Sequence, residues 1–351
     1  MACIIKLPDE TKGIVTFTSP EDRETGVTTK SGFEQLKDRW VVGCHHNWQT
    51  EPHNFAFDFS MGRKGSITPS DAPVIDFDAS CFSAKEFYPW QNHTKFWDVF
   101  HVARAVSHRS IDNFMHVMRK IFDRGVNMRA LLLVAIPDDN GDVSPPDPLK
   151  LYDDMFSFEE KRMFNFFPIE YNYPFPFDYE TLAFYYNSSK VFLNAQGVGL
   201  PCRISTQAVA CGLPFITYPW KIPLIPNAMQ NPPAHYVGSS LDELADLTIK
   251  AVNEYSPNNE AVSKASDHFN YEKCMVKLKG MFREFYESRN LPFTDAGWNL
   301  HNLDYRIARH HGISIGSNRI PMNVEKFIEI LNSPLDQIPI HSENLEMDLC
   351  N

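Results

Sequence analysis

Residues 182–214 decide the fold, and they read LAFYYNSSKVFLNAQGVGLPCRISTQAVACGLP. The stretch opens with a short amphipathic helix that begins near Leu182 and leads into an apolar strand at residues 190–193. A second helix spans residues 206–211, and Gly212 ends it. Because helices and strands alternate at short intervals, the stretch predicts a βαβ arrangement with parallel strands.

The same alternation continues on both sides of this stretch. Upstream, residues 96–103 predict a buried strand, and a helix begins after the N-cap Ser110 and ends at Gly125. Residues 130–136 form a continuous apolar run, which is typical of a strand in a parallel sheet that is covered on both faces. Downstream, Ser240 is the predicted N-cap of a further helix. We therefore expect an α/β fold built on a doubly wound parallel sheet.

The composition excludes several classes of protein. The chain has 351 residues, of which 43% are hydrophobic, so it fits about two domains and is not disordered as a whole. The formal charge of −11 gives no strong signal for nucleic-acid binding. No apolar run approaches the roughly 20 residues of a transmembrane helix, and the first residues have no secretory signal pattern. The seven cysteines have no CxxC spacing, which favours reduced thiols and a cytoplasmic location over disulfides or a zinc site.

The junction between the strand at residues 96–103 and its helix carries two arginines. Arg104 and Arg109 flank a turn at the C-terminal end of the strand, where ligands bind in open parallel sheets. The following helix directs its positive N-terminus to the same place, and arginine binds phosphate through paired donors. The sequence therefore predicts phosphate binding here, with two solvated loop arginines as an equally simple interpretation.

A second junction with similar properties follows the strand at residues 190–193. Its candidate binding residues combine flexible backbone with polar side chains, and they are Gln196, Gly197, Gly199, Arg203, Ser205, Thr206 and Gln207. Glycine lets the backbone approach a ligand closely, and the N–H groups that open a helix can hold a phosphate. Gln207 lies one turn into the helix and could reach a ribose diol. An ordinary strand-to-helix loop would explain one such junction, whereas two on one sheet favour a phosphate site.

The order of these motifs resembles that of the GT-B glycosyltransferases, specifically those like family 4 (glycosyl transferases group 1). In that family a strand ends in Val-Gly-Arg and a lysine follows; Arg104 matches the arginine, and Arg109 stands where the lysine is. The family segment of the form EGfG…EAmAcGlPvv resembles residues 196–214, and the whole resemblance covers residues 74–286. It implies a GT-B-like fold with a Rossmann-type donor domain.

The resemblance also implies a division of the chain into three segments. It places a reduced N-terminal α/β lobe, on the acceptor side, at residues 1–90 and a nucleotide-sugar donor-binding domain at residues 91–270. A C-terminal helical segment and tail would occupy residues 271–351. Because the N-terminal lobe is short for the family, we expect either a reduced acceptor side or a lobe that a partner chain or the C-terminal tail completes.

The activity implied by the resemblance is transfer of a sugar from a nucleotide-diphosphate sugar, such as a UDP- or GDP-sugar, to a hydroxyl group of a glycan or other acceptor. Arg104 and Arg109 would bind and neutralise the diphosphate of the donor. Further phosphate donors would be Arg203, Ser205 and Thr206. We expect no metal ion and no cofactor besides the nucleotide sugar, and the family favours retention of the anomeric configuration.

Two family glutamates are replaced in this chain. They appear as Gln196 and Gln207, which lie eleven residues apart and so farther apart than in the family. In the family the first glutamate lies near the donor sugar, and the second binds the ribose of the nucleotide. Glutamine keeps the capacity for hydrogen bonding but carries no charge. Ribose binding by Gln207 is therefore retained more readily than charge stabilisation by Gln196.

His45 and His46 follow a predicted strand in the N-terminal lobe. Because histidine titrates near neutral pH, these side chains are candidates for a general base or a sugar contact. Packed or surface histidines in a loop are the simpler interpretation. Adjacent residues of a strand face opposite sides, so a metal-binding pair is disfavoured.

Two other functions stay open at this point. Asp76 and Asp78 form a DxD pattern, which holds a divalent metal in GT-A glycosyltransferases. A protein of another class, a non-catalytic donor-binding subunit that needs a partner chain, would also fit the short N-terminal lobe and the loss of both glutamates. A homo-oligomer is compatible with each of these interpretations.

Overall fold

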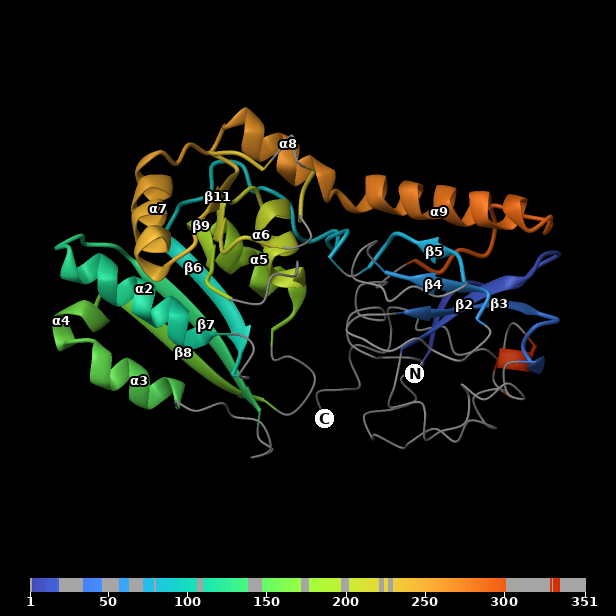
Figure 1. Cartoon of the computed structure of the whole chain (residues 1–351), viewed down its shortest axis with the longest axis horizontal. Helices are drawn as coiled ribbons and strands as arrows, with labels where there is room; N and C mark the ends of the chain where they lie inside the picture. Colours follow the sequence, from blue (N-terminus) through green and yellow to red (C-terminus); the bar gives the residue numbers. More distant parts are fainter. Residues whose placement is uncertain are drawn as a thin grey trace. The chain divides into compact units, whose positions relative to one another are not determined.

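Figure 1 shows a computed structural model of the chain, in which helices and strands alternate along most of the sequence. The structure describes residues 2–18, 34–45, 57–62, 72–78, 80–105, 110–137, 147–171, 177–196, 202–220, 224–226, 230–300, 329 and 331–334. The chain forms two compact units. We call Ser80–Cys274 the central unit, and Met1–Ala79 together with Met275–Asn351 the terminal unit.

Six parallel strands form the sheet of the central unit. They are β6 (Trp97–Arg104), β7 (Ala130–Pro137), β8 (Phe164–Tyr171), β9 (Ser189–Asn194), β10 (Phe215–Thr217) and β11 (His235–Val237). Their order across the sheet is β11-β10-β9-β6-β7-β8, and every neighbouring pair is parallel. The chain runs outward from β6 to β8, returns to place β9 beside β6, and runs outward again to β11. The doubly wound parallel sheet predicted from the sequence is confirmed.

Helices connect these strands and cover both faces of the sheet. The helices described in this unit are α2 (Ile111–Asp123), α3 (Pro148–Met155), α4 (Phe158–Lys161), α5 (Tyr179–Asn187), α6 (Arg203–Ala210), α7 (Leu241–Asn253) and α8 (Glu260–His268). Helix α9 (Tyr271–Ser288) begins in this unit and continues into the terminal unit. Helices α2 and α7 cover one face, and α5 and α6 lie over the other (Figure 1). The mixed α/β architecture therefore matches the prediction.

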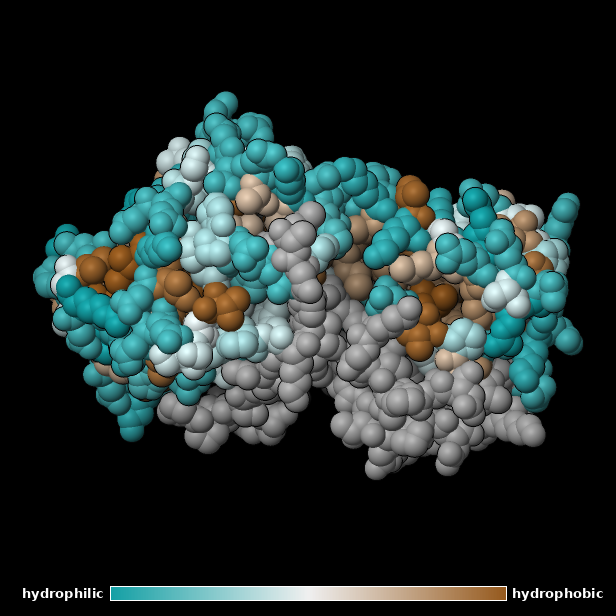
Figure 2. Space-filling view, turned by 45° about the horizontal axis from the view of Figure 1, so that its top comes forward, coloured by the Kyte–Doolittle hydropathy of each residue, from teal (hydrophilic) through white to brown (hydrophobic). Residues whose placement is uncertain are grey.

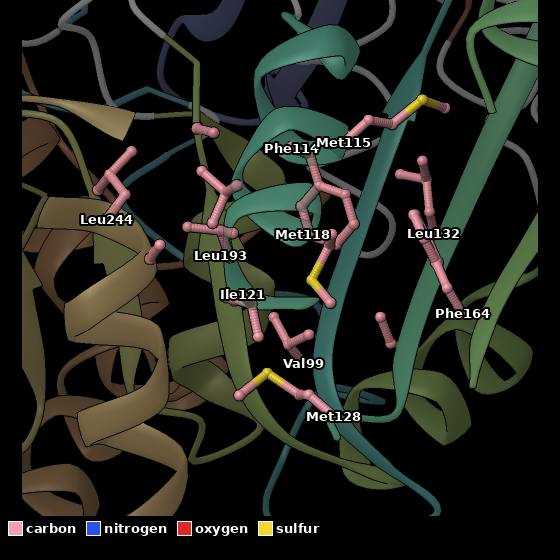
Figure 3. Close-up of a cluster of buried hydrophobic side chains, with 14 of the residues drawn as sticks. Val99, Phe114, Met115, Met118, Ile121, Met128, Leu132, Phe164, Leu193 and Leu244 are labelled. Atoms are coloured by element: carbon pink, nitrogen blue, oxygen red, sulfur yellow. The ribbon is translucent and has the colours of Figure 1, made fainter. Parts of the chain in front are cut away.

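The core beneath α2 is largely aliphatic. Figure 3 shows Phe114, Met118 and Ile121 of α2 among strand side chains such as Leu132 of β7 and Leu193 of β9. All five side chains have no exposed surface. The spacing of the three α2 residues, at intervals of four and three, places them on one stripe of the helix. Burial of this stripe fixes α2 against the sheet and so fixes where the helix begins.

The opposite face of the sheet carries aromatic side chains. Phe100 of β6 and Phe192 of β9 lie side by side, with ring centroids 5.9 Å apart. Tyr186 of α5 packs on both, at 5.0 Å from Phe100 and 5.6 Å from Phe192. Because successive strand residues point to opposite faces, an alternation of aliphatic and aromatic residues in β6 and β9 creates two different faces from the same strands.

The predicted positions of four helix ends are confirmed, and at one of them, Ser110, the expected cap bond is not made. Gly125 and Gly212, with φ of 71° and 75°, end α2 and α6 in the left-handed conformation that glycine adopts readily. The Ser240 side chain accepts a hydrogen bond from the backbone N–H of Glu243 and caps α7. Ser110 makes no such cap bond, because its φ of 48° and ψ of 48° are left-handed, whereas capping requires an extended residue.

The terminal unit contains a second sheet. Its strands are β1 (Ala2–Lys6), β2 (Gly13–Thr18), β3 (Trp40–His45), β4 (Phe59–Met61) and β5 (Val74–Ile75), and they lie in this order. The pair β1 and β2 is antiparallel, and the other pairs are parallel. Gly43 is required in β3, because a Cβ atom there would lie 2.2 Å from the Phe59 ring.

The C-terminal part of the chain belongs to this second sheet. Phe282 and Phe285 of α9 pack edge-on against Phe59 of β4, with centroids 5.3 Å and 5.6 Å apart. The division into units therefore differs from the expected segments 1–90, 91–270 and 271–351, because residues from Met275 onward pack with the N-terminal strands. The central unit also begins earlier than expected, at Ser80.

The described surface in Figure 2 is mostly hydrophilic, with apolar side chains in separate patches. The exposed large hydrophobic residues are Tyr88, Phe96, Leu149, Phe158, Phe167, Phe184, Val237 and Val276. Within the described part of the chain, the helices lack the combined length and apolarity that a membrane span requires.

Candidate functional site

The C-terminal ends of β6 and β9 are neighbours in the sheet of the central unit. These strands pair in parallel, with Val99 opposite Val191 and Phe100 opposite Phe192. The strand order reverses between them, because β7 and β8 lie on one side and β10 and β11 on the other. In open α/β sheets, ligands bind at such a reversal, outside the carboxyl ends of the strands. The two junctions identified in the sequence therefore meet at the edge where a ligand is expected.

Arg104 is the last residue of β6 and extends to this edge. The six residues before it in the strand are buried, whereas Arg104 is exposed. A guanidinium group at this position can meet an anion through two parallel N–H donors. Arg109, the second predicted arginine, lies outside the described residues, as do the other residues at 106–109.

The N-terminus of α2 lies against the end of β9. Asn113, in the first turn of α2, donates a hydrogen bond from Nδ2 to the carbonyl oxygen of Ala195 at 3.1 Å. Ala195 follows the last residue of β9, so this bond joins the β6–α2 junction to the β9–α6 junction. Asp112 places a carboxylate in the same first turn, which reduces the attraction of this helix end for an anion.

The β9–α6 junction is held by a second asparagine. Asn194, the last residue of β9, accepts a hydrogen bond from the backbone N–H of Gln196 at 3.1 Å. Its Nδ2 donates to Ser205 Oγ at 3.0 Å and lies 3.3 Å from Cys202 Sγ. Cys202 occupies the N-cap position of α6 and makes no side-chain cap bond. The strand end and the helix start are thus tied to one side chain.

Arg203 is the first residue of α6 and carries the positive charge of this junction. Its guanidinium donates to the hydroxyl oxygen of Tyr179 at 3.2 Å and stacks over the Tyr179 ring at 5.7 Å. Stacking on an aromatic ring restricts the orientation of the guanidinium plane. The charge therefore lies at the N-terminus of α6, where the helix dipole also attracts anions.

Ser205 and Thr206, predicted as phosphate donors, are both fully buried. Ser205 Oγ accepts from Asn194 at 3.0 Å, and Thr206 Oγ1 donates to the carbonyl oxygen of Ser80 at 2.9 Å. Their hydroxyl groups thus make hydrogen bonds inside the central unit. The structure brings both residues to the predicted junction, with side chains directed into the protein.

Gln196 and Gln207 are also brought to this junction, and both are nearly buried, at 3% and 4% exposure. Gln207 Oε1 accepts a hydrogen bond from the hydroxyl of Tyr186 at 3.4 Å, and the same hydroxyl donates to the carbonyl oxygen of Ile204 at 2.9 Å. Burial raises the pKa of Tyr186 well above its usual value, so this hydroxyl stays a donor at neutral pH.

The structure does not place the remaining predicted site residues at this edge, and several of them lie outside the described residues. Gly197, Gly199 and His46 fall outside the described residues. His45 ends β3 in the terminal unit, where its backbone but not its side chain is described. Asp76 and Asp78 also belong to the terminal unit, directly after β5. In the described part of the chain, no group of three or more His, Cys, Asp and Glu side chains could hold a metal ion.

Asn113 and Asn194 were not among the residues predicted from the sequence. An asparagine directly after an apolar run, followed two residues later by a polar residue, is a local signal for an Asx turn and could have identified Asn194. The contacts from Asn113 to Ala195 and from Asn194 to Ser205 span 82 and 11 residues. Such pairs become evident only when the strand order is known.

Comparison with known proteins identifies the fold. No protein-family model matches the chain, and no curated protein matches its sequence. Among solved structures, TarM gives a TM-score of 0.52 at 14% identity, covering 78% of this chain and 54% of TarM. HepE from Anabaena in complex with UDP gives 0.51 at 9% identity, covering 78% of both chains. Sucrose-phosphate synthase from Thermosynechococcus elongatus gives 0.50 at 12% identity, covering 73% of this chain and 71% of that one.

These structures are GT-B glycosyltransferases, and this chain has the GT-B fold. The predicted fold class is therefore confirmed. The chain spans about half the length of TarM, at 54%. At identities of 9% to 14% the likeness concerns the fold, and fold alone does not determine substrate or activity.

Proposed function

We propose that this protein is a glycosyltransferase that binds a nucleotide-diphosphate sugar at the C-terminal edge between β6 and β9. The observation that carries the proposal is the reversal of strand order between these strands, with Arg104 at the end of β6 and Arg203 opening α6 after β9. The GT-B fold and the UDP bound in the HepE structure support a nucleotide sugar as the ligand class. The sugar is transferred to a hydroxyl group of a glycan or other acceptor.

The diphosphate is bound by positive charge and by backbone N–H groups. Arg104 supplies a guanidinium from the strand end, and Arg203 supplies another at the uncapped N-terminus of α6. Arg109, Gly197 and Gly199 are further proposed contacts on the basis of the sequence. Because Ser205 and Thr206 are buried and hydrogen-bonded within the central unit, they shape the turn in this proposal.

The glutamines bind the sugar portions of the donor. Gln207 contacts the ribose, since it lies one turn into α6 and its amide is oriented by Tyr186. Gln196 contacts the donor sugar from the end of β9, and its backbone is held by Asn194. Either side chain must turn toward the ligand, because both are nearly buried without it.

The proposed reaction mechanism depends on where negative charge develops as the donor reacts. As the bond between the sugar and the diphosphate breaks, negative charge grows on the leaving group, and Arg104 and Arg203 stabilise it electrostatically. A metal ion is not required if these cations, together with Arg109, perform that role. Retention of configuration and a contact from His45 or His46 to the acceptor or donor sugar complete the proposal. The pattern of cysteines favours the cytoplasm as the location.

A second candidate function is a donor-binding subunit that needs a partner chain for catalysis. The observation that favours it is the replacement of both family glutamates by Gln196 and Gln207. Such a subunit would bind the nucleotide sugar with the same residues but would neither hydrolyse nor transfer it alone. A homo-oligomer would be one way to supply the missing groups.

The test is calorimetric titration of the whole chain with UDP-, GDP-, ADP- and TDP-sugars, with and without EDTA. Arg104→Ala is the test variant. Arg129→Ala is the matched control, because Arg129 precedes β7 at the N-terminal end of the same sheet and its side chain is 53% exposed. We expect saturable binding of one nucleotide, loss of binding in Arg104→Ala, and no change in Arg129→Ala or with EDTA.

The other outcomes separate the alternatives. Absence of binding by every nucleotide sugar would contradict the proposed function. Binding that EDTA abolishes would support the Asp76 and Asp78 alternative, and Asp76→Ala would then be the next variant. Binding without hydrolysis or transfer, across a panel of glycan acceptors, would favour the donor-binding subunit.

A further inference from the structure

The side chain of Asn194 joins the two ends of the connection between β9 and α6. It is 1% exposed, and its Oδ1 accepts a hydrogen bond from the N–H of Gln196 at 3.1 Å. Its Nδ2 donates to Ser205 Oγ at 3.0 Å and to Cys202 Sγ at 3.3 Å. One side chain therefore holds both the residue that follows the strand and the turn that begins the helix.

These contacts engage the amide oxygen and the amide nitrogen of Asn194 together. The bond to Gln196 is local and has the form of an Asx turn. The bonds to Cys202 and Ser205 reach another element, and the sulfur and hydroxyl also contact each other at 3.4 Å. In the low dielectric of a buried site such a network is stiff, because breaking one bond leaves a buried polar group without a partner. The end of β9 and the start of α6 are thus held in a fixed position relative to each other.

Ser205 has no exposed surface, and its hydroxyl belongs to this network. A phosphate outside the carboxyl edge of the sheet cannot contact a fully buried hydroxyl unless the network opens. The side chain of Ser205 is therefore suited to hold α6 in place. Arg203, two residues earlier in the same turn, is only half-buried.

We propose that Asn194 is a positioning residue for the nucleotide-diphosphate sugar, and that Ser205 acts through Asn194 rather than as a ligand of the phosphate. This inference rests on the proposed function. The bond between Asn194 and Ser205 sets the N-terminus of α6, with Arg203, relative to Gln196 at the end of β9. Groups from the two elements are then in place before the donor arrives, which increases affinity because less ordering is required on binding.

The test is a double-mutant cycle on nucleotide affinity, with Asn194→Ala, Ser205→Ala and the double variant. Calorimetry measures Kd for the nucleotide diphosphate that the wild type binds best. We expect each single variant to weaken binding about fivefold to tenfold, because both lose the buried hydrogen bond between Asn194 and Ser205. The double variant should bind as the weaker single variant does, because the second substitution removes an interaction that is already lost.

Asn187→Ala is the control for a purely structural effect. Asn187 is also fully buried and also makes three hydrogen bonds, but it lies just before β9, at the opposite end of the strand. Its replacement should lower the melting temperature as much as Asn194→Ala does, while Kd stays within about twofold of the wild type. Hydrogen exchange of the ligand-free variants adds a second readout. We expect faster exchange at the Gln196 amide and in the first turn of α6 in Asn194→Ala, and unchanged exchange there in Asn187→Ala.

Two results would overturn the inference and leave the proposed function intact. One is a wild-type affinity in Asn194→Ala with unchanged exchange at Gln196. The other is a double variant whose loss of affinity equals the product of the two single losses, which would make Ser205 a direct ligand of the phosphate. If the wild type itself binds no nucleotide, the proposed function fails, and this inference fails with it.

Discussion

The two ends of β9 carry the same residue type in different surroundings. At the N-terminal end, Asn187 accepts from the backbone N–H of Trp90 at 2.8 Å and donates to the carbonyl oxygens of Ala183 and Tyr88 at 3.0 Å and 3.1 Å. At the C-terminal end, Asn194 holds a strand end and a helix start. Both side chains are buried, and each makes hydrogen bonds through its amide oxygen and through its amide nitrogen. The difference lies in what surrounds them.

The N-terminal end of the sheet is covered by rings. His93 packs edge-on against Trp90 and Phe184, with ring centroids 5.1 Å and 5.6 Å apart, and Phe96 packs on Trp97 at 6.0 Å. The C-terminal end instead presents Arg104 and the start of α6. In a parallel sheet all carboxyl ends share one edge, so polar groups that follow several strands gather there. One end of this sheet is therefore closed by packed rings, and the other exposes a charged side chain at the edge where we propose that the donor binds.

The largest effect is expected from removing the charge at the C-terminal end of the sheet. Arg104→Ala should lower kcat/KM for donor hydrolysis or transfer by about 10²- to 10³-fold, because it removes a charge that stabilises the leaving diphosphate. Arg129→Ala, at the opposite end of the sheet, removes a partly exposed ion pair with Asp98 at 3.6 Å and an exposed hydrogen bond to the carbonyl oxygen of Lys95, and it should change kcat/KM less than about twofold. Steady-state kinetics on both variants checks this. Equal effects of the two substitutions would contradict a site at the C-terminal edge.

Asn187→Ala should affect stability without affecting the site. The substitution removes three hydrogen bonds made by a fully buried side chain, so we expect the free energy of unfolding to fall by about 2–4 kcal/mol. Urea denaturation measures this loss, and calorimetry should find the same nucleotide affinity as in the wild type. A large loss of affinity at a temperature where the variant is folded would show that the two ends are coupled.

We expect His235 to make the stability of the central unit sensitive to acid. Its ring stacks on Phe215 at 4.0 Å and contacts Thr217 Oγ1 through Nε2 at 2.9 Å. Burial lowers the pKa of His235 to about 4, below the 6.5 expected in the unfolded chain. The unfolded chain therefore binds the proton first, and stability falls as pH decreases from about 6.5 to about 4, by an amount on the order of 1–3 kcal/mol.

Urea titrations across this pH range test the effect of His235. His235→Gln should flatten the dependence of the unfolding free energy on pH. The exposed His116→Gln on α2 is the matched control and should leave the slope as in the wild type. An unchanged slope in His235→Gln would assign the acid sensitivity to another group.

Phe96→Ser should have the smallest effect. Phe96 is 47% exposed and contacts His93 and Trp97 edge-on at 6.5 Å and 6.0 Å. Loss of these contacts should cost about 1 kcal/mol of stability and leave nucleotide affinity unchanged. Urea denaturation and calorimetry measure the two quantities. A tenfold loss of affinity would mean that the aromatic end also serves binding.

Much of the central unit could be predicted from sequence, because its strands are short apolar runs bounded by clear helix signals. Strand β9 and helix α6 fall within one or two residues of the predicted strand and within three of the predicted helix. Strand β8 was missed, because Asn165, Pro168 and Glu170 interrupt its apolar pattern. Proline is tolerated there since β8 is an edge strand, paired with β7 alone. The position of a strand at the edge of a sheet depends on tertiary contacts, so the local sequence pattern does not reveal it.

The site was predictable in part for the same reason. The spacing of strand and helix placed Arg104, Gln196 and Gln207 at the junctions where the structure has them. The association of α9 with the terminal sheet and the roles of Asn113 and Asn194 depend on contacts between distant residues. Periodicity carries no information about such pairs. The binding and catalytic roles of all candidate site residues stay predictions, including those of Arg109, Gly197, Gly199, His45 and His46.

The most direct test of the central claim is hydrogen exchange of the whole chain with and without the nucleotide sugar that calorimetry identifies. The account predicts slower exchange in peptides that cover residues 101–105 and 194–207, at the carboxyl ends of β6 and β9. Peptides that cover residues 88–97 and 126–131, at the aromatic end of the sheet, should exchange as before. Protection confined to the aromatic end, or protection at neither end despite saturating ligand, would contradict it.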